Sequence, residues 1–479
     1  MAPMRDLREV VNLFQKQKEL KEIEGAHWNL EIGTLTELMY DADGPALLFD
    51  KVLDYSPGYR ILSNSYTTLR RQLFLLGFPP DWSRDQGVAE LEKKLAGYRP
   101  IKPVTVKNGP VMENVFVDGE VNLLKFPTPK WHELDGGRYL GTGCAVFLRD
   151  PEIEGWVNAG TYRICVYDER TLGLYITPNH HGGVIEKKYW DRGLSCPVAV
   201  DFGPSPMLYM AAAGRFINDY GVSEYDVAGY MQGEPIEVIM DRYTGLPIPA
   251  RSEIVVVGEV PPPSVESRPE GPFGEWTGYY AHGQRNEPII RVKALYHRND
   301  PIILGEPTLF PKGDVGLWGG GNLKRQLEAA GIPDVIDAWL LFWPGIEVVK
   351  IKQRYPGHAA KAGLVATGNY MGRVVVVVDE DINIRDPWEV LWAIGTRCDP
   401  ESSVEIVRGF QSSTLDPRIP PDKKAAGDFS SSRMIINACK PYHWFKEFPA
   451  VNRCSPELRR EVYSKWKDIF RSFPVENLS

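Results

Sequence analysis

Six apolar residues near the beginning of the chain recur at helical spacing: Leu7, Val10, Val11, Phe14, Leu20 and Ile23. Residues three and four apart share one face of a helix, so this pattern predicts an amphipathic helix over residues 5–24. The apolar run PALLFDKV at residues 45–52 predicts a short buried strand. The proline-rich stretch RPIKPVTVKNGP near residue 100 then predicts the end of a small N-terminal α/β domain.

The middle third of the chain has the pattern of strands. RICVYDERTLGLYITP (163–178) predicts two strands joined by a charged turn, and SEIVVVGEV (252–260) and IIRVKALYHR (289–298) predict two more. Proline and glycine clusters such as VPPPS separate these segments. Frequent strands with few helical windows between them favour an antiparallel barrel or sandwich.

The last third of the chain changes to an alternation of strand and helix. RVVVVVDEDI (373–382) is an apolar run typical of a parallel strand buried on both faces. Asp386 and Pro387 follow as the cap and first turn of a helix. A terminal helix is predicted over residues 455–473, capped by Ser455, with one apolar stripe: Leu458, Val462, Trp466, Ile469, Phe470 and Phe473. Such a stripe covers either the chain's own core or a partner subunit.

Composition narrows the class of protein. A chain of 479 residues is too long for a single core, so two or three domains are expected. A net charge of −8 argues against a broad nucleic-acid surface, and no apolar run is long enough to span a membrane. No secretory signal is recognised, and the six cysteines form no CxxC pair. Reduced thiols and a cytoplasmic location are therefore expected.

The segment EGPFGEW at residues 270–276 is the most informative candidate for chemistry. Glu270 and Glu275 bracket glycines and a proline, so they lie on a structured turn rather than on a helix. Two carboxylates in one partly buried place repel each other, which raises one pKa and makes a proton donor near neutral pH. From spacing alone, two solvated glutamates on a surface loop are the more common explanation.

Four shorter segments carry further candidates. Asn158 and Arg163 lie in NAGTYR, His180 lies in TPNHHGG, Glu224 lies in GVSEYD, and Lys361 lies in HAAKAG. Each has a plainer explanation as a turn residue, a loop histidine, a helix cap or a solvent-exposed lysine. The glycine run LWGGGNL matches no nucleotide-binding pattern and predicts a flexible loop.

In this order and spacing, these segments resemble the UbiD family of reversible decarboxylases that use prenylated FMN. The resemblance covers about residues 5–445, and EGPFGE followed by TGYY is its most specific part. It implies a multidomain α/β protein with an N-terminal α/β domain (1–105), a central split β-barrel like that of flavin reductases (106–315), a C-terminal α/β domain (316–454) and a dimerisation helix (455–479).

The resemblance also implies the roles of the candidate residues. Glu275 corresponds to the proton donor, Arg163 holds the substrate carboxylate, and Glu270 completes an ion-pair network. Asn158, His180 and Glu224 correspond to ligands of Mn²⁺ or Mg²⁺, and their mixed, mostly hard donors suit those ions better than zinc. Flavin contacts are implied for these three residues and for Thr161, Tyr162, Arg163, Asn179 and Lys361.

A monovalent cation, K⁺ or Na⁺, is implied near Ala213, Gly214 and Phe216. The implied substrate pocket contains Ile176, Asn179, Trp276 and Leu317. Because Trp276 would narrow that pocket and offer a face for stacking, a planar aromatic or heteroaromatic acid is favoured. The chain departs from the family where the motif Ile-Asp-Ala-Thr is expected, since it reads Ile436-Asn437-Ala438-Cys439.

The expected activity is thus a carboxy-lyase that removes a carboxyl group from an aromatic, heteroaromatic or α,β-unsaturated acid, or adds one to the product. A flavin prenyltransferase of the UbiX type is the expected source of the cofactor, and a homodimer or a hexamer of dimers is the expected assembly. A split-barrel flavin oxidoreductase is the alternative function. A binding protein with an inactive site is a third reading, against which the complete residue set argues.

Overall fold

The computed structural model of the protein describes residues 4–141, 143–312, 316–319, 323–342, 345–368, 372–452 and 454–466. Its first sheet has the strand order β1-β2-β3-β17. The strands are β1 (Leu20–Glu24), β2 (Ala46–Asp50), β3 (Arg60–Ser63) and β17 (Ile302–Gly305). The helices of this part are α1 (Leu7–Lys16), α2 (Glu31–Asp41), α3 (Leu69–Leu75) and α4 (Arg84–Ala96). The strand predicted at 45–52 is therefore confirmed as β2.

The helix predicted over residues 5–24 is wrong in its second half. Helix α1 ends at Lys16, and Lys18 adopts a left-handed backbone with φ of 59°, so the chain turns. Leu20 and Ile23 then lie in β1, which pairs in parallel with β2. The helical spacing of these two residues is only a local signal. Pairing with β2 satisfies the backbone hydrogen bonds of the whole segment, and this stabilisation outweighs the local preference for a helix.

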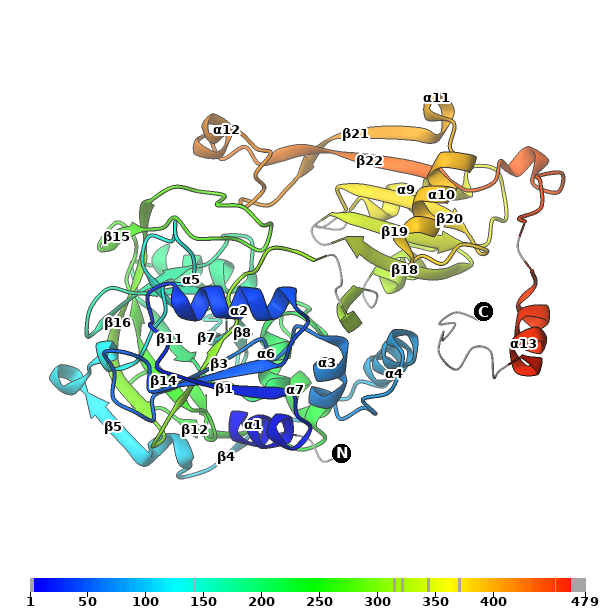
Figure 1. The fold of residues 1–479 in the computed structure, drawn as a ribbon. Helices are drawn as coiled ribbons and strands as arrows, with labels where there is room; N and C mark the ends of the chain where they lie inside the picture. The colour runs from blue at the N-terminus through cyan, green and yellow to red at the C-terminus, as the bar shows by residue number, and fades with distance from the viewer. Residues whose placement is uncertain are drawn as a thin grey trace.

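The central sheet has ten strands and curls into a half-barrel (Figure 1). Its main order is β6-β9-β10-β16-β14-β11-β7-β8, with β5 and β15 paired to β16. The strands are β5 (Asn114–Val117), β6 (Arg138–Gly141), β7 (Ala145–Arg149), β8 (Val157–Gly160), β9 (Arg163–Val166), β10 (Thr171–Tyr175), β11 (Cys196–Asp201), β14 (Ile254–Val260), β15 (Ser267–Glu270) and β16 (Arg285–His297). All four strands predicted in this region are present, and the paired ones are antiparallel.

Three helices and a small sheet accompany the half-barrel. The helices are α5 (His181–Trp190), α6 (Pro206–Ala212) and α7 (Glu224–Gln232). The small sheet has the order β13-β12-β4, from β4 (Val104–Thr105), β12 (Glu237–Met240) and β13 (Pro247–Pro249). Helices α6 and α7 pack against each other and against β8, which places the beginning of α7 beside the NAGTYR segment.

The C-terminal domain contains a five-stranded sheet in the order β18-β19-β20-β22-β21. Its strands are β18 (Val335–Phe342), β19 (Ile346–Ile351), β20 (Val374–Asp379), β21 (Val404–Gln411) and β22 (Ser430–Ala438). Strand β20 lies in the middle and runs parallel to both neighbours, as its apolar sequence predicted. The helices are α8 (Leu323–Ala329), α9 (His358–Ala366), α10 (Pro387–Arg397), α11 (Pro400–Ser403) and α12 (Pro421–Ala425).

The connection between β21 and β22 reaches out of the C-terminal sheet. Residues 412–429, here called the C-terminal arm, carry α12 above the half-barrel (Figure 1). Two bonds fix the arm there: Thr414 Oγ1 lies 3.1 Å from the Tyr175 hydroxyl, and Lys424 Nζ donates to the Ala281 carbonyl at 2.9 Å. The arm therefore forms one side of the boundary between the two domains.

The terminal helix α13 (Pro456–Lys465) lies apart from the C-terminal sheet (Figure 1). Ser455 caps it as predicted, by accepting from the Leu458 amide. The predicted stripe residues Ile469, Phe470 and Phe473 lie outside the described residues. The multidomain α/β organisation with a curled central sheet and a terminal helix is confirmed. None of the described helices is long and apolar enough to cross a membrane.

Candidate active site

Arg163 lies between the two glutamates of the EGPFGEW segment. It is the first residue of β9, and its Nη2 donates to Glu270 at 2.6 Å while its Nη1 donates to Glu275 at 2.5 Å. All three side chains are buried. The structure thus brings together the three residues that the sequence had singled out for catalysis, from segments more than a hundred residues apart.

The loop that carries the two glutamates has a fixed shape. Glu270 is the last residue of β15, and the Gly278 amide donates to the Glu275 carbonyl at 2.8 Å in a tight turn. The loop rests on Gly136, where a Cβ atom would lie 1.9 Å from the Gly271 carbonyl oxygen. Only glycine allows the two backbones to approach this closely, so position 136 is part of what sets the site.

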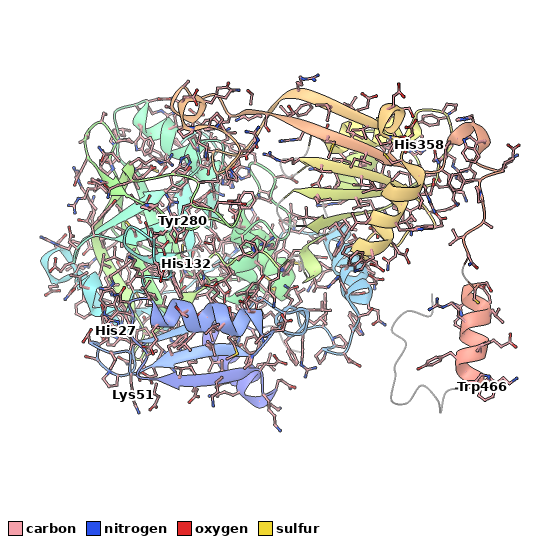
Figure 2. All side chains as sticks on the ribbon, turned by 45° about the horizontal axis from the view of Figure 1, so that its top comes forward. His27, Lys51, His132, Tyr280, His358 and Trp466 are labelled. Carbon is pink, nitrogen blue, oxygen red and sulfur yellow. The ribbon has the colours of Figure 1, made fainter. Side chains whose placement is uncertain are left out.

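Three residues that support this loop were not found from the sequence. The Gly274 amide donates to Asp135 Oδ1 at 3.2 Å, and Asp135 also accepts from the His132 amide. The buried Tyr139 hydroxyl donates to Glu270 Oε1 at 2.7 Å. His132 and Tyr280 mark this region in Figure 2. No local motif marks Asp135 or Tyr139, because each acts through a contact with a residue more than a hundred positions away in the sequence.

Burial and charge act in opposite directions at the proposed proton donor. Burial raises the pKa of Glu275 to about 7, although the cation Arg163 lowers it, and the neighbouring Glu270 raises it further. Burial also disfavours the charged form of Arg163, but the two carboxylates outweigh that effect and raise its pKa. Near neutral pH, Glu275 therefore exists in both protonation states, as a proton donor requires.

A second contact fixes Arg163 from the neighbouring strand. Tyr175 is its direct partner in the ladder between β9 and β10, and the guanidinium carbon lies 4.6 Å from the Tyr175 ring centroid. The Arg285 guanidinium lies 4.7 Å from the same centroid. The ring thus stabilises two cations that would otherwise repel each other.

Two of the three predicted metal ligands are in contact. Asn158 Nδ2 donates to Glu224 Oε1 at 3.1 Å, and the Ala159 amide donates to Glu224 Oε2 at 2.8 Å. Both side chains are buried. His180 is exposed and has no direct bond to them in the described structure; its ring lies 6.5 Å from that of Tyr162, whose hydroxyl is 3.5 Å from Asn158 Oδ1.

The donor set at Glu224 fits a cation. Its carboxylate is 1 % exposed and forms no ion pair with any described residue, so burial raises its pKa to about 7. A buried carboxylate in this situation requires a proton or a cation to neutralise it. Among the described residues, no three His, Cys, Asp or Glu side chains form a metal cluster.

The backbone near the implied monovalent-cation segment lies beside the NAGTYR segment. The Thr161 amide donates to the Ala212 carbonyl at 3.2 Å, and its hydroxyl donates to the Cys144 carbonyl at 3.1 Å. Helix α6 ends at Ala212 with Ala213 as its C-cap, and Gly214 turns the chain with φ of 67°. Ala213 thus directly follows Ala212, whose carbonyl accepts from Thr161. Thr161 lies two residues after Ala159, whose amide donates to Glu224.

Lys361 and Asn179 remain apart from the other candidates. Lys361 is exposed on α9, the helix that begins at His358 in the C-terminal domain (Figure 2). Asn179 is exposed in the loop before α5. In the residues that the structure describes, neither side chain has a bond to Arg163, Asn158 or Glu224.

The predicted substrate-pocket residues do not share one surface. Trp276 is half-buried at a cavity of about 340 Å³ between the half-barrel and the C-terminal domain. Leu317 lies elsewhere: its amide donates to Gln72 of α3, and its side chain lies over Gly87 of α4. Ile176 is buried in the core that lies inside the half-barrel.

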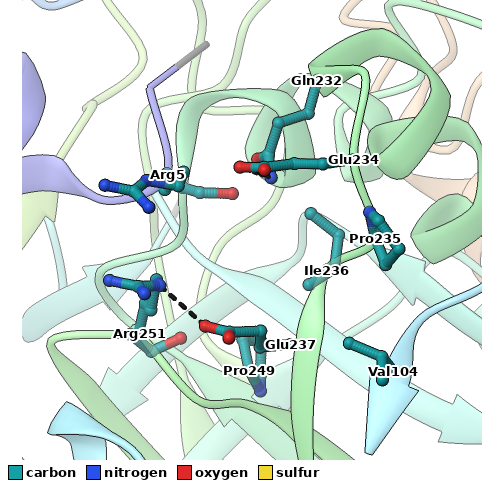
Figure 3. Close-up of a pocket in the computed structure, with 11 residues that line it drawn as sticks. Arg5, Val104, Gln232, Glu234, Pro235, Ile236, Glu237, Pro249 and Arg251 are labelled. Carbon is teal, nitrogen blue, oxygen red and sulfur yellow. Dashed lines mark hydrogen bonds and ion pairs between the residues drawn. The ribbon is translucent and has the colours of Figure 1, made fainter. Parts of the chain in front are cut away.

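A different cavity, of about 210 Å³, lies near the N-terminus (Figure 3). Arg5, Glu234, Glu237 and Arg251 line it, and Arg251 donates to Glu237 at 2.8 Å. None of the predicted catalytic or metal-binding residues lines this cavity. Its charged side chains are of both signs, and Arg251 and Glu237 are hydrogen-bonded to each other. This cavity is therefore not the candidate active site.

Comparison with known proteins links this geometry to a family. Models of the N-terminal, Rift-related and C-terminal domains of 3-octaprenyl-4-hydroxybenzoate carboxy-lyase match residues 11–90, 102–309 and 320–438. The chain is 29 % identical to a pyrrole-2-carboxylic acid decarboxylase of Pseudomonas aeruginosa, over 97 % of this chain and 98 % of that protein. It is 31 % identical to a phenolic acid decarboxylase of Bacillus subtilis, over 83 % and 84 % respectively.

Solved structures agree with the sequence relatives. The vanillic acid decarboxylase of Sedimentibacter hydroxybenzoicus is 26 % identical; its closed form gives a TM-score of 0.85 over 98 % of this chain and 100 % of that one, and its open form gives 0.80. The UbiD-class enzyme HmfF of Pelotomaculum thermopropionicum, solved with FMN, is 25 % identical and gives 0.81 over 96 % and 100 %.

Proposed function

Because the chain belongs to the UbiD family of carboxy-lyases, we propose that it removes the carboxyl group of an aromatic or heteroaromatic acid with the help of prenylated FMN. The buried Glu270–Arg163–Glu275 network carries the proposal. Relatives that act on pyrrole-2-carboxylic acid and phenolic acids support an aromatic substrate. The UbiD-class structures in complex with FMN and with prFMN support the cofactor.

The roles of the three residues follow from their charges. Arg163 binds and orients the substrate carboxylate, and Glu270, held by Tyr139, keeps the guanidinium in place. The carbon–carbon bond to the carboxyl group breaks, CO₂ leaves, and protonated Glu275 delivers one proton to the ring carbon. Glu275 then regains its proton from solvent. The prenylated flavin, when bound, supplies the reactive centre that accepts the electrons of the breaking bond.

The residues present fit such a cofactor and a metal. Arg163 Nε is buried without a hydrogen-bond partner in the described structure, so the site has a donor in reserve for a bound group. Asn158, His180 and Glu224 would hold Mn²⁺ or Mg²⁺, and Lys361 would approach a phosphate from the C-terminal domain. The turn at Ala213 and Gly214 would hold K⁺ or Na⁺.

Cofactor analysis tests this function directly. The protein is produced together with a flavin prenyltransferase, and the released cofactor is identified by absorbance and intact mass. Prenylated flavin together with release of CO₂ from an aromatic acid is the expected result. Plain flavin with reductase activity would favour the split-barrel oxidoreductase instead, and a protein that binds no flavin would contradict both enzymatic functions.

A further inference from the structure

The cavity beside Trp276 has an aromatic side and a polar side. Trp276 and Phe310, from the half-barrel and the segment after it, form part of the aromatic side. Arg373, Ser413 and Arg418, from the C-terminal domain and its arm, form part of the polar side. The volume of about 340 Å³ is within the range of small-molecule sites. The two sides suit a flat ring that carries a polar group.

Thr277 lines this cavity and has a side-chain hydroxyl without a partner among the described residues. Thr277 is 8 % exposed, and its Oγ1 is buried without a hydrogen bond in the part of the chain that the structure describes. Leaving a buried hydroxyl unsatisfied costs about 1–3 kcal/mol. A ligand that brings a hydrogen-bonding group to Thr277 would remove that cost, and Thr277 is only two positions from the proposed proton donor Glu275.

The charged residues around the cavity are mostly cationic. Among its described lining residues are three arginines, Arg373, Arg418 and Arg433, and a single carboxylate, Asp416. Asp416 already pairs with Arg373 and accepts from Ser412 at 2.7 Å. The exposed Arg418 side chain forms no ion pair with a described residue. Arg418 is therefore a cation at this cavity that an anion would neutralise.

The arm holds this cavity close to the Arg163 network. Thr414, between lining residues Ser413 and Asp416, bonds the Tyr175 hydroxyl, and the Tyr175 ring lies against Arg163. On the other side, Trp276 and Thr277 directly follow Glu275. The cavity is thus connected to Arg163 through Thr414 and Tyr175, and to Glu275 through the chain itself.

We propose that this cavity selects the part of the substrate remote from the leaving carboxyl group, and that it takes an aromatic acid with a second carboxylate. This inference rests on the proposed function and specifies its substrate class. The second carboxylate accepts from Thr277 and Arg418, while the ring packs against Trp276. An aromatic acid without a second anionic group would leave the Thr277 hydroxyl and the Arg418 guanidinium without this partner.

The test compares benzoate with its two dicarboxylate counterparts, isophthalate and terephthalate. Binding to the full-length, cofactor-loaded protein is measured by titration calorimetry, and hydrogen–deuterium exchange into the decarboxylated ring is followed in parallel. At least one dicarboxylate should bind about tenfold more tightly than benzoate, the gain expected for one charge-assisted hydrogen bond. The same three acids are measured with each variant.

Arg418→Gln should abolish this preference without changing the affinity for benzoate. Arg408→Gln is the matched control, since Arg408 is an exposed arginine on β21 that does not line the cavity. Thr277→Val, which keeps the shape of the side chain, should reduce the preference in part. Equal binding of benzoate and both dicarboxylates to the unmodified protein, or a preference that survives Arg418→Gln, would overturn the inference alone. If none of the three acids binds, the inference is likewise overturned, whereas the proposed function is tested separately by the released cofactor and by CO₂ release.

Discussion

Tyr175 and Thr414 share a buried hydrogen bond of 3.1 Å between their hydroxyl groups, across the boundary between the half-barrel and the C-terminal arm. The same tyrosine ring lies 4.6 Å from the Arg163 guanidinium carbon. Docking of the arm and orientation of Arg163 therefore depend on one side chain.

We therefore expect Tyr175→Phe and Thr414→Val each to raise KM for the acid about two- to tenfold, the range expected for one net hydrogen bond. In Tyr175→Phe the aromatic ring is retained and would still pack on Arg163, so kcat should change less than KM. Steady-state kinetics of both single variants and the double variant check this. If the effects are additive, the two hydroxyl groups are not coupled in function and the relationship is only structural.

Glu275→Gln should leave flavin and metal bound and reduce decarboxylation by a factor of about 100 or more, because general acid catalysis contributes that much. Rate and hydrogen exchange into product are measured together. Glu154→Gln, at an exposed glutamate, is the control. A variant that decarboxylates at nearly the original rate with full cofactor would place the proton donor elsewhere.

The pH dependence follows from the same residue. Since the pKa of Glu275 is raised to about 7 and the protonated form is the active acid, the rate of the protonation step should be highest below that value. It should fall as pH rises through about 7. The dependence of kcat on pH, with the Glu270–Glu275 pair titrating as a unit, checks this. A rate that increases from pH 6 to pH 8 would contradict the assignment of Glu275 as the acid.

Glu224→Ala and His180→Ala should each release both the divalent metal and the flavin, because the proposed metal ligands are also among the residues expected to contact the flavin. Metal analysis and cofactor absorbance of the purified variants give the two occupancies. His181→Ala is the matched control, because His181 packs against Trp156 and Tyr220 instead. Full occupancy in His180→Ala would remove that residue from the ligand set.

Removal of residues 455–479 should convert the native assembly to monomers or aggregates. Leu458 and Val462 on α13 and Trp466 at its C-cap are 47 %, 44 % and 50 % exposed, which shows that their apolar side chains are not covered by the described part of this chain. Light scattering of the truncated and intact proteins compares their masses. A truncated protein that keeps the intact assembly would show that the terminal helix is not the dimerisation element.

Much of the fold could be predicted, because its strongest elements carry their signals locally. The uninterrupted valines of β20 predicted a central parallel strand, and Asp386 predicted the first turn of α10, where it accepts from the Trp388 amide. The boundary between α1 and β1 could not be predicted in this way. Leu20 continues the helical spacing, and only its distant partner Ala46 in β2 decides against the helix.

The residues of the candidate active site divide in the same way, into those with a local sequence signal and those whose roles depend on distant contacts. Glu270, Glu275 and Arg163 were found because they lie in family motifs, but Tyr139, Asp135 and Gly136 were not, since each acts through a contact with a residue far away in sequence. From sequence alone, the position of Glu224 before a helical segment is typical of a helix cap. Glu224 does begin α7, yet its carboxylate accepts from Asn158 and Ala159 instead of capping the helix.

The pairing of β17 with β3 has a consequence for biosynthesis. The fourth strand of the first sheet is Ile302–Gly305, about 240 residues after β3, and no earlier segment takes that edge. During translation the first hundred residues thus emerge with an unpaired strand edge, which is prone to aggregation. The nascent chain can close this sheet only after the whole half-barrel has left the ribosome. Chaperone dependence during synthesis should therefore extend past residue 305.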